Sequence, residues 1–346
     1  MPHLVAAPDK FRGTAAASEV AAAAARAGAS RGWSCAQVPM ADGGEGILDA
    51  LSGRTRRTSV RGPLGEAVVA EWHLDDRTAV VEMARASGLE LAGGPRRNDP
   101  VAASTIGTGQ LIAAAVAAGA RRVIVGVGGS ATTDGGLGAL RALEPHARLA
   151  RVELVVACDV TTTFVEAAQE FAPQKGASPA QVALLRRRLE RLAQVYEDEH
   201  GVDVRRLPGS GAAGGLAGGL AALGATLIPG FELVAEAVGL AEEIGEAQLV
   251  VTGEGFLDEQ SFRGKVVGGV TELAAQAHVP VLAVVGEVVD RDLPALRHDG
   301  NDGYRDVSVV SLVERHGRER AITRTLECVE DEVASYLAAL QAVRRV

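Results

Sequence analysis

The sequence predicts an α/β protein with largely parallel sheets. Short β-rich runs alternate with alanine-rich helical stretches along the 346 residues, a pattern typical of strands joined by crossover helices. Most of these runs do not alternate polar and apolar residues, so we expect their strands to be covered on both faces. Nearly all of them end in Gly, Asp, Glu or Pro, which places these residues at the strand ends where open α/β sheets bind ligands.

Seven apolar runs are the candidate strands of the parallel sheets. In chain order they read "HLVAAP", "SCAQVPM", "RRVIVGVGG", "VELVVACD", "AQLVVTGEG", "VPVLAVVGE" and "DVSVVSLVE". The clearest helix begins at Ser178, a predicted N-cap, with Pro179 at the first helical position and Gln181 completing a capping box. Its buried stripe would consist of Val182, Leu185, Leu189 and Leu192.

The pattern changes between residues 56 and 83. This stretch alternates polar and apolar residues and contains turn pairs at Gly62-Pro63 and Asp75-Asp76, which indicates antiparallel strands. We interpret it as the entry to a second domain with a mixed sheet. The length also suits two domains better than one. We therefore expect residues 1–55 and 240–346 to form a parallel α/β domain, and residues 56–239 to form an inserted mixed-sheet domain.

Composition narrows the choice of partners and compartment. A formal net charge of -9 argues against nucleic acid, because binding its backbone needs a basic surface. The three cysteines lie far apart without a CxxC pair, which favours a reducing cytoplasm over a disulfide frame or a zinc site. No signal-peptide pattern opens the chain, and the uncharged stretch 207–231 contains glycine pairs and prolines. We therefore expect a cytoplasmic protein without a membrane partner.

Four glycine loops at expected strand ends carry the candidate chemistry. They read "PMADGGEG", "GVGGSATTDGGLG", "PGSGAAGGLAGG" and "VTGEGFLDEQSFRGK". Free N–H groups in such loops favour an anion, yet three of the four also contain carboxylates, which would repel a phosphate. Mg²⁺ resolves this conflict, because it prefers one or two carboxylates together with phosphate oxygens and water. The residues thus favour an enzyme that handles a Mg²⁺-nucleotide or a phosphate.

Simpler explanations stay open for the individual residues. The glycines permit tight turns and close helix packing, and Asp42 and Asp134 are each suitable helix N-caps. A G-x-G-x-x-G at Gly209–Gly214 lacks a preceding apolar strand, and Gly126–Ala131 fits only the looser form of that motif. Nicotinamide binding is therefore weakly indicated. A P-loop is excluded, because valine follows Lys265 where that motif needs Ser or Thr, and the first glycine of the motif is absent.

Ten stretches in order resemble the bacterial glycerate kinases of the type I family, and they cover most of the chain up to about Gly286. They are "AAPDKFRGTAAASEVA", "VPMADGGEG", "RGPLGEAV", "VEMARASGLEL", "STIGTGQLI", "VGVGGSATTDGG", "VACDVT", "PQKGA", "PGSGAAGGLAGGL" and "LVVTGEGFLDEQSFRGKV". A set of ordered motifs is far more specific than any single loop.

The resemblance implies a fold and a reaction. It implies two three-layer α/β/α domains, one with a mostly parallel Rossmann/flavodoxin-like sheet and one with a mixed sheet, and an active site in the cleft between them. The reaction it implies is transfer of the ATP γ-phosphate to D-glycerate, usually giving 2-phosphoglycerate, with Mg²⁺ as the metal. The sequence leaves open which hydroxyl is phosphorylated and whether the protein is a monomer or a homodimer.

The roles of single residues are our hypotheses. We assign catalysis to Asp42, which would orient the attacking hydroxyl, and to the cations Lys175 and Lys265. Substrate binding is assigned to Asp9, Lys10, Arg12 and Glu45. Nucleotide or phosphate binding is assigned to Gly128, Gly129, Ser130, Thr132, Gly211, Gly253 and Gly255. Metal binding is assigned to Asp134, Asp159 and Glu254.

Some positions depart from the family pattern. The chain is shortened around Arg148–Val152 and again before Lys175, and Thr162-Thr163 replaces the usual Asn-Pro. Ala172 replaces a glycine and Thr133 an asparagine. These departures motivate two alternatives. One is a catalytically weak relative that senses a nucleotide or a small hydroxy acid, and the other is a kinase for a different small hydroxy acid.

Overall fold

The structure, a computed structural model, describes residues 1–11, 13–262, 264–290, 293 and 307–343. The chain forms two compact units: unit 1 comprises residues 1–42 and 231–346, and unit 2 comprises residues 43–230. The boundaries expected at 55 and 240 differ from these. The sequence pattern changes only at the first antiparallel strand, whereas the preceding helix α2 (Ile47–Ala50) already packs against a strand of unit 2.

Unit 1 is built on a five-stranded parallel sheet in the order β13-β11-β9-β1-β2. Its strands are β1 (His3–Ala6), β2 (Ser34–Gln37), β9 (Leu249–Thr252), β11 (Val281–Val285) and β13 (Val307–Ser311). All five coincide with predicted apolar runs. A separate two-stranded ribbon, β10 (Phe256–Leu257) with β12 (Glu287–Val288), continues the chain beyond β9 and β11.

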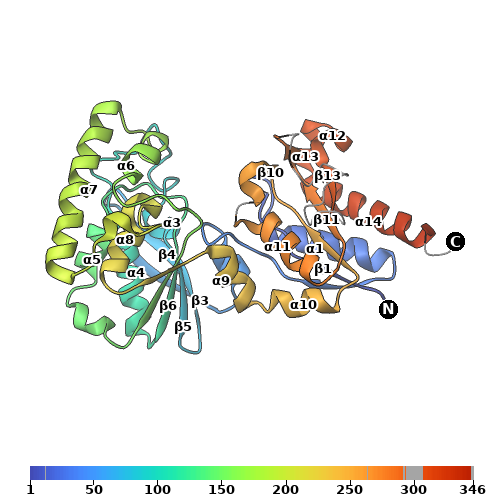
Figure 1. Cartoon of the computed structure of the whole chain (residues 1–346), viewed down its shortest axis with the longest axis horizontal. Helices are drawn as coiled ribbons and strands as arrows, with labels where there is room; N and C mark the ends of the chain where they lie inside the picture. Colours follow the sequence, from blue (N-terminus) through green and yellow to red (C-terminus); the bar gives the residue numbers. More distant parts are fainter. Residues whose placement is uncertain (12, 263, 291–292, 294–306, 344–346) are drawn as a thin grey trace. The chain divides into compact units, whose positions relative to one another are not determined.

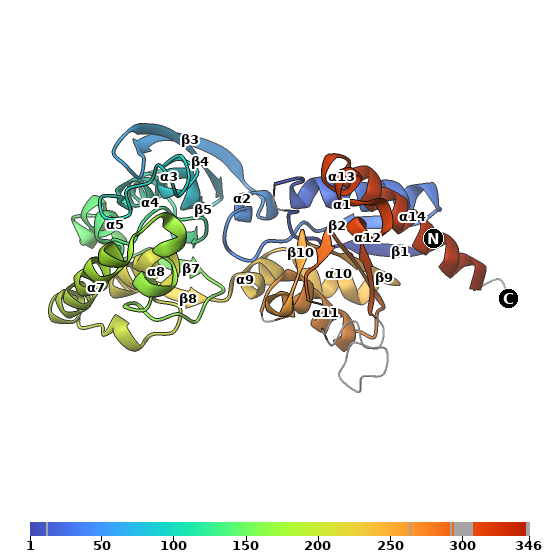
Figure 2. The ribbon, with the colours of Figure 1, turned by 90° about the horizontal axis from the view of Figure 1, so that it is seen from above.

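Helices cover both faces of this sheet (Figure 2). One face packs on α1 (Ala17–Ser30) and α14 (Thr325–Val343), in a core that includes Leu4, Val251 and Leu282. Residues one position further along the strands, such as Ala283, face the other core, which includes Val267 of α11 (Val266–Gln276). The remaining helices of this part are α9 (Gly230–Ala237), α10 (Leu240–Glu246), η4 (Glu259–Phe262), α12 (Leu312–His316) and α13 (Arg318–Thr323). The three-layer arrangement of this unit follows from that alternation.

Unit 2 is built on a six-stranded mixed sheet in the order β3-β4-β5-β6-β7-β8. The predicted antiparallel stretch is confirmed, because β3 (Arg54–Arg61), β4 (Ala67–Asp75) and β5 (Thr78–Glu82) pair antiparallel. From β5 onward the pairing is parallel through β6 (Arg122–Gly126), β7 (Glu153–Ala157) and β8 (Thr226–Ile228). The α/β class, with one parallel and one mixed sheet, is therefore confirmed.

The helices of unit 2 form two packed groups (Figure 1). The sheet shares one core with α4 (Ile106–Ala117), α5 (Leu137–Ala142) and α8 (Ala212–Ala222). A second core, centred on Tyr196, joins α8 to the long helix α7 (Pro179–His200). The shorter elements are α3 (Ala84–Ser87), η1 (His146–Leu149), α6 (Ala167–Glu170), η2 (Pro173–Lys175) and η3 (Val204–Arg206).

The start of α7 has the predicted local structure. The Ser178 hydroxyl accepts a hydrogen bond from the Gln181 N–H, and the Gln181 side chain accepts one from the Ser178 N–H, which forms the expected capping box. Leu185 and Leu189 are buried, as the stripe requires. None of the helices in the described part of the chain is long and apolar enough to cross a bilayer.

Candidate functional site

In unit 1, loops after β1, β2 and β9 meet at the carboxyl edge of the sheet. The Asp9 N–H donates to the Gly253 carbonyl at 2.8 Å, and the Met40 N–H donates to the Pro8 carbonyl at 2.9 Å. These bonds continue the strand pairing past the ends of the strands. They bring together carboxylates that lie far apart in the sequence: Asp9, Asp42 and Glu254.

Asp9 is a buried carboxylate with several charged neighbours. It is 9% exposed, and burial raises its pKa to about 6, with the charge of Asp42 adding to the rise. Lys10 and Lys265 lower the pKa of Asp9, so both ammonium groups lie near this carboxylate. The site therefore combines two interacting acids with two cations.

Glu254 is the third acid of this group. Its pKa is raised to about 7, chiefly by burial and also by the charges of Asp9 and Asp258, against the lowering effects of a hydrogen bond from Ser261 and of the Lys265 charge. Its Oε1 atom is buried and accepts no hydrogen bond from the residues that the structure describes. A buried carboxylate oxygen without a donor is costly, and a bound cation would remove that cost.

These carboxylates could supply part of the ligands of a magnesium ion, but not a complete set. No group of three His, Cys, Asp or Glu residues in the described ranges is arranged to hold a metal ion. The metal roles of Asp134, Asp159 and Glu254 stay predictions. Mg²⁺ needs only one or two carboxylates when phosphate oxygens and water complete its shell. Glu254 and Asp9 meet that smaller requirement. Arg12, a predicted substrate ligand, lies outside the described residues.

In unit 2, two glycine loops lie directly against each other. The Val127 N–H donates to the Gly43 carbonyl at 3.1 Å. A Cβ atom on Gly128 would stand 2.7 Å from the Gly44 Cα, so only glycine permits this approach. Beyond it, the N–H groups of Gly128, Gly129 and Ser130 donate no hydrogen bond to any described residue. Successive free N–H groups around a left-handed residue, here Gly129 with φ 61°, form an anion-binding concavity.

A carboxylate nevertheless lies beside this concavity. An ideal Cβ on Gly129 would fall 1.7 Å from Oε1 of Glu45, so the Glu45 side chain occupies the space above that glycine. The structure therefore keeps the conflict noted in the sequence, an anion cradle next to an acid. A phosphate bound here would need a cation that contacts both the phosphate and the Glu45 carboxylate.

Asp134 has a structural position. Its carboxylate accepts hydrogen bonds from the Thr105 N–H and hydroxyl, both at 2.9 Å, and from N–H groups at the start of α5. It therefore ties the N-terminus of α5 to the residue that precedes α4, and its charge favours both helix ends. The capping explanation fits Asp134 better than the metal one. Asp159, the other predicted metal ligand of this unit, accepts the Gly230 N–H at 2.7 Å.

Lys175 lies beneath the second glycine loop rather than at its surface. The residue is 3% exposed, and its ammonium donates to the Thr132 carbonyl at 2.6 Å. Burial lowers its pKa to about 7, against the charge of Asp134, which raises it. Asn98 reinforces the same contact, because its amide nitrogen donates to the carbonyls of Ala131 and Lys175. Lys175 thus supports the loop from inside and does not face solvent.

Three glycines predicted to bind nucleotide contact the protein itself. A Cβ on Gly253 would stand 1.9 Å from the Val284 carbonyl, so this glycine permits close packing of β9 on β11. The Gly255 carbonyl accepts the Glu287 N–H in the β10–β12 ribbon. A Cβ on Gly211 would stand 2.4 Å from the Thr163 carbonyl oxygen. Close packing is therefore a structural reason for glycine at positions 211 and 253.

Sequence reasoning missed Glu82 and Asn98. Glu82 ends the buried strand β5 and accepts the Gly46 N–H at 3.0 Å. An acid at the end of a buried strand is a signal that can be read from the sequence. Asn98 stands in a loop without any motif, so nothing in the sequence marked it. The Thr162-Thr163 departure is accommodated locally, because Thr163 donates to Glu166, which precedes α6, and Thr162 donates to Glu170 at the end of α6.

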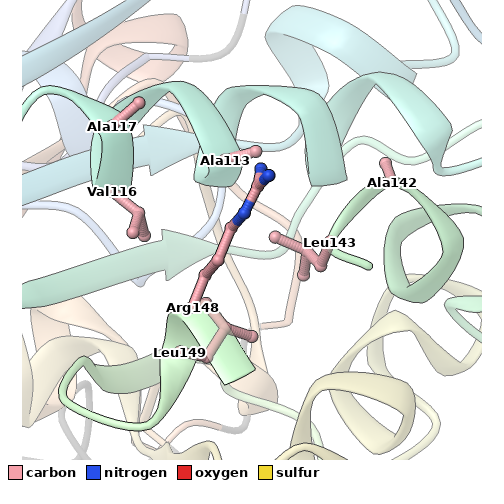
Figure 3. A pocket seen from close by; sticks show the side chains of 7 residues that line it. All are labelled: Ala113, Val116, Ala117, Ala142, Leu143, Arg148 and Leu149. Atoms are coloured by element: carbon pink, nitrogen blue, oxygen red, sulfur yellow. The ribbon is translucent and has the colours of Figure 1, made fainter. Parts of the chain in front are cut away.

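A small pocket of about 110 Å³ lies on unit 2 between α4, α5 and η1 (Figure 3). Its lining is apolar except for the Arg148 guanidinium, which extends toward Ala113 (Figure 3). It contains no predicted site residue. Its lining residues are Ala113, Val116, Ala117, Ala142, Leu143, Arg148 and Leu149.

Comparison with protein families gives one match. The model described as the glycerate kinase family matches residues 4–146 and 144–340. The two matched stretches meet close to the connection around Arg148 that the sequence analysis identified as shortened.

Several known proteins are similar over most of their length. The chain is 40% identical to a glycerate 2-kinase of Escherichia coli (strain K12), with 88% of this chain and 90% of the relative covered. It is 39% identical to a glycerate kinase of Bacillus subtilis (strain 168), with 86% and 88% covered. A crystal structure of a candidate glycerate kinase 2 from Salmonella typhimurium LT2 superimposes with a TM-score of 0.84 at 33% identity, over 100% of both chains.

Proposed function

Because the chain belongs to the glycerate kinase family, we propose that it transfers the γ-phosphate of ATP to D-glycerate and forms 2-phosphoglycerate. The observation that carries this proposal is the acidic cluster of Asp9, Asp42 and Glu254 with two lysines at the carboxyl edge of a parallel sheet. The name of the Escherichia coli relative supports the 2-hydroxyl as the acceptor. We also propose membership of the type I group and a cytoplasmic location.

Within the cluster we assign the acceptor chemistry to Asp42. Phosphoryl transfer needs a carboxylate that orients the attacking hydroxyl and accepts its proton. Asp42 lies close enough to Asp9 for its charge to raise the Asp9 pKa, so it belongs to the same acidic cluster. Lys10 would pair with the glycerate carboxylate. Lys265, at the N-terminus of α11, would neutralise charge on the transferred group. The substrate roles of Asp9 itself and of Arg12 stay predictions.

For the nucleotide we assign two features. The free N–H groups of Gly128, Gly129 and Ser130 would hold phosphate oxygens. Glu254, with its unsatisfied buried oxygen, would hold Mg²⁺, which when bound neutralises phosphate charge. Asp134 and Lys175 we reassign to holding this loop in shape, on the basis of their hydrogen bonds. That the active site lies in a cleft between the domains, and that the protein is a monomer or a homodimer, stay predictions.

Coupled ADP release tests the proposal. The purified protein with Mg²⁺ and ATP should release ADP when D-glycerate is added, and phosphorus NMR of the product should show the 2-phosphate ester. L-glycerate, lactate and glycolate serve as the comparison panel. Release of ADP only with another hydroxy acid would identify a kinase of different specificity. If the protein binds nucleotide but releases no ADP with any of these acids, it is a sensor and the proposal is overturned.

A further inference from the structure

Glu82 is a buried acid outside the assigned site. It is the last residue of β5, pairs in register with Gly126 of β6, and is 3% exposed. Burying a carboxylate costs free energy unless hydrogen bonds or a charge partner compensate. The contacts of this side chain therefore indicate why an acid stands here.

The carboxylate of Glu82 holds a loop. Its Oε2 accepts the N–H of Gly46 at 3.0 Å, and its Oε1 lies 3.3 Å from the Arg85 Nε one turn along the chain. Hydrogen bonds from a backbone N–H to an ionised carboxylate are about twice as strong as neutral ones. Gly46 has a φ of 96°, a left-handed conformation that glycine adopts without strain.

The same loop is held at its other end by β6. The Gly43 carbonyl accepts the Val127 N–H at 3.1 Å. Between these two fixed points lies Glu45, whose carboxylate stands over Gly129, the exposed residue of the anion cradle. Restraint of both ends leaves Glu45 little freedom to leave that position.

We propose that Glu82 is a positioning residue: it fixes the loop from Gly43 to Gly46 and so keeps the Glu45 carboxylate at the Gly128–Ser130 cradle. The functional part of this inference rests on the proposed phosphoryl transfer. Its structural part, the restraint of Gly46, does not. A displacement of about 1 Å near a reacting group can reduce turnover about 100-fold, which sets the size of the expected effect.

Three variants test the positioning role. Glu82→Met removes the acceptor at similar length, and Glu82→Gln keeps an acceptor oxygen. Glu332→Met removes a buried acid that pairs with His316 and Arg315 elsewhere, and so controls for the loss of any buried carboxylate. The measurements are amide hydrogen exchange in the peptide containing Gly46, thermal stability, and kcat and KM for D-glycerate.

We expect E82M to speed exchange at Gly46 at least tenfold and to lower kcat about 100-fold. E82Q should keep protection at Gly46 and lose less than tenfold in kcat. E332M should lose thermal stability but change neither Gly46 exchange nor kcat. If E82M does not fold, Glu82→Asp, whose shorter side chain cannot reach the Gly46 N–H, should give the same faster exchange.

Two results would overturn the inference. One is a folded E82M protein with Gly46 still protected, which removes the restraint itself. The other is faster exchange at Gly46 with unchanged kcat in an otherwise active enzyme, which removes the link to the reaction. A wild-type protein that releases no ADP with D-glycerate refutes the proposed function separately, and the exchange data still decide whether Glu82 restrains the loop.

Discussion

At the residue scale, the acids of unit 1 indicate how carboxylates could take part in the phosphate site that we propose. Burial raises the pKa of Asp9 to about 6 and that of Glu254 to about 7. A carboxylate in such surroundings is held in a costly charged form near neutral pH. Either a proton or a cation can relieve that cost. The same groups are thus suited both to proton transfer and to binding a divalent ion that arrives with a nucleotide.

Replacing Asp42 tests the proton-transfer assignment. Asp42→Asn should lower kcat by about 100-fold or more, because general base catalysis contributes roughly 10²–10⁴ in rate. Asp49→Asn, which changes an exposed carboxyl in the same part of the chain, should leave kcat unchanged. Steady-state kinetics of both variants, with circular dichroism to confirm folding, provides the test. Near-normal turnover of D42N would remove Asp42 from this role.

Lys175 predicts a distinct dependence of stability on pH. Burial lowers its pKa from 10.5 to about 7, so between these pH values the unfolded chain binds a proton that the folded protein does not. The free energy of unfolding should therefore rise with pH across this window, by up to about 1.4 kcal/mol per unit from this group. Below pH 7 both states are protonated, and the burial penalty is fully present.

The test compares wild-type protein with Lys175→Met by urea unfolding between pH 7 and 9. Burial raises the pKa of Cys35 and of Cys158 to about 11 in the folded protein, so above pH 9 these thiols ionise mainly in the unfolded chain and add a pH dependence of their own. Measurements below pH 9 limit this effect. K175M should show a flatter dependence on pH than wild type. Equal slopes for the two proteins would mean that the Lys175 ammonium is not desolvated as the structure indicates.

At the element scale, local sequence signals account for most of the secondary structure. Long runs of Val, Leu and Ala identified every strand of the parallel sheet in unit 1, and alternation identified the antiparallel strands of unit 2. Among the described strands, β8, β10 and β12 were not predicted. They are only two or three residues long, and pairing with neighbours defines them. A stretch that short has no periodicity to read.

The capping box of α7 gives a prediction at this scale. Ser178→Ala removes the hydroxyl that accepts the Gln181 N–H and should reduce the free energy of unfolding by about 1 kcal/mol. Ser18→Ala, at an exposed position inside α1, should be neutral or slightly stabilising, because alanine is the better helix former. Chemical denaturation of both variants measures the difference. Equal stability of the two would argue against a contribution from the cap.

At the scale of the whole molecule, the candidate site was only partly predictable. Strand ends marked Asp42 and Glu254 as candidate site residues, and in the structure the charge of Asp9 interacts with both of them. A carboxylate in a glycine loop looks alike in sequence whether it caps helices or binds metal, so the hydrogen bonds of Asp134 to Thr105 and to the start of α5 were not predictable. Lys175 was predicted as a catalytic cation, and its burial was not predictable. Its burial depends on Asn98 and on the loop above it, which only the folded chain brings together.

The central claim is that acidic glycine loops accept a triphosphate only when a divalent cation shields them. Thermal unfolding with ATP and Mg²⁺ together, with each alone, and with ATP plus chelator tests this directly. We predict stabilisation of roughly 2.7 kcal/mol when the Mg²⁺-ATP concentration is 100 times its Kd, and little from ATP with chelator. The protection should weaken below about pH 6, as protons compete for Asp9 and Glu254. Equal protection by ATP without any divalent cation would contradict the account.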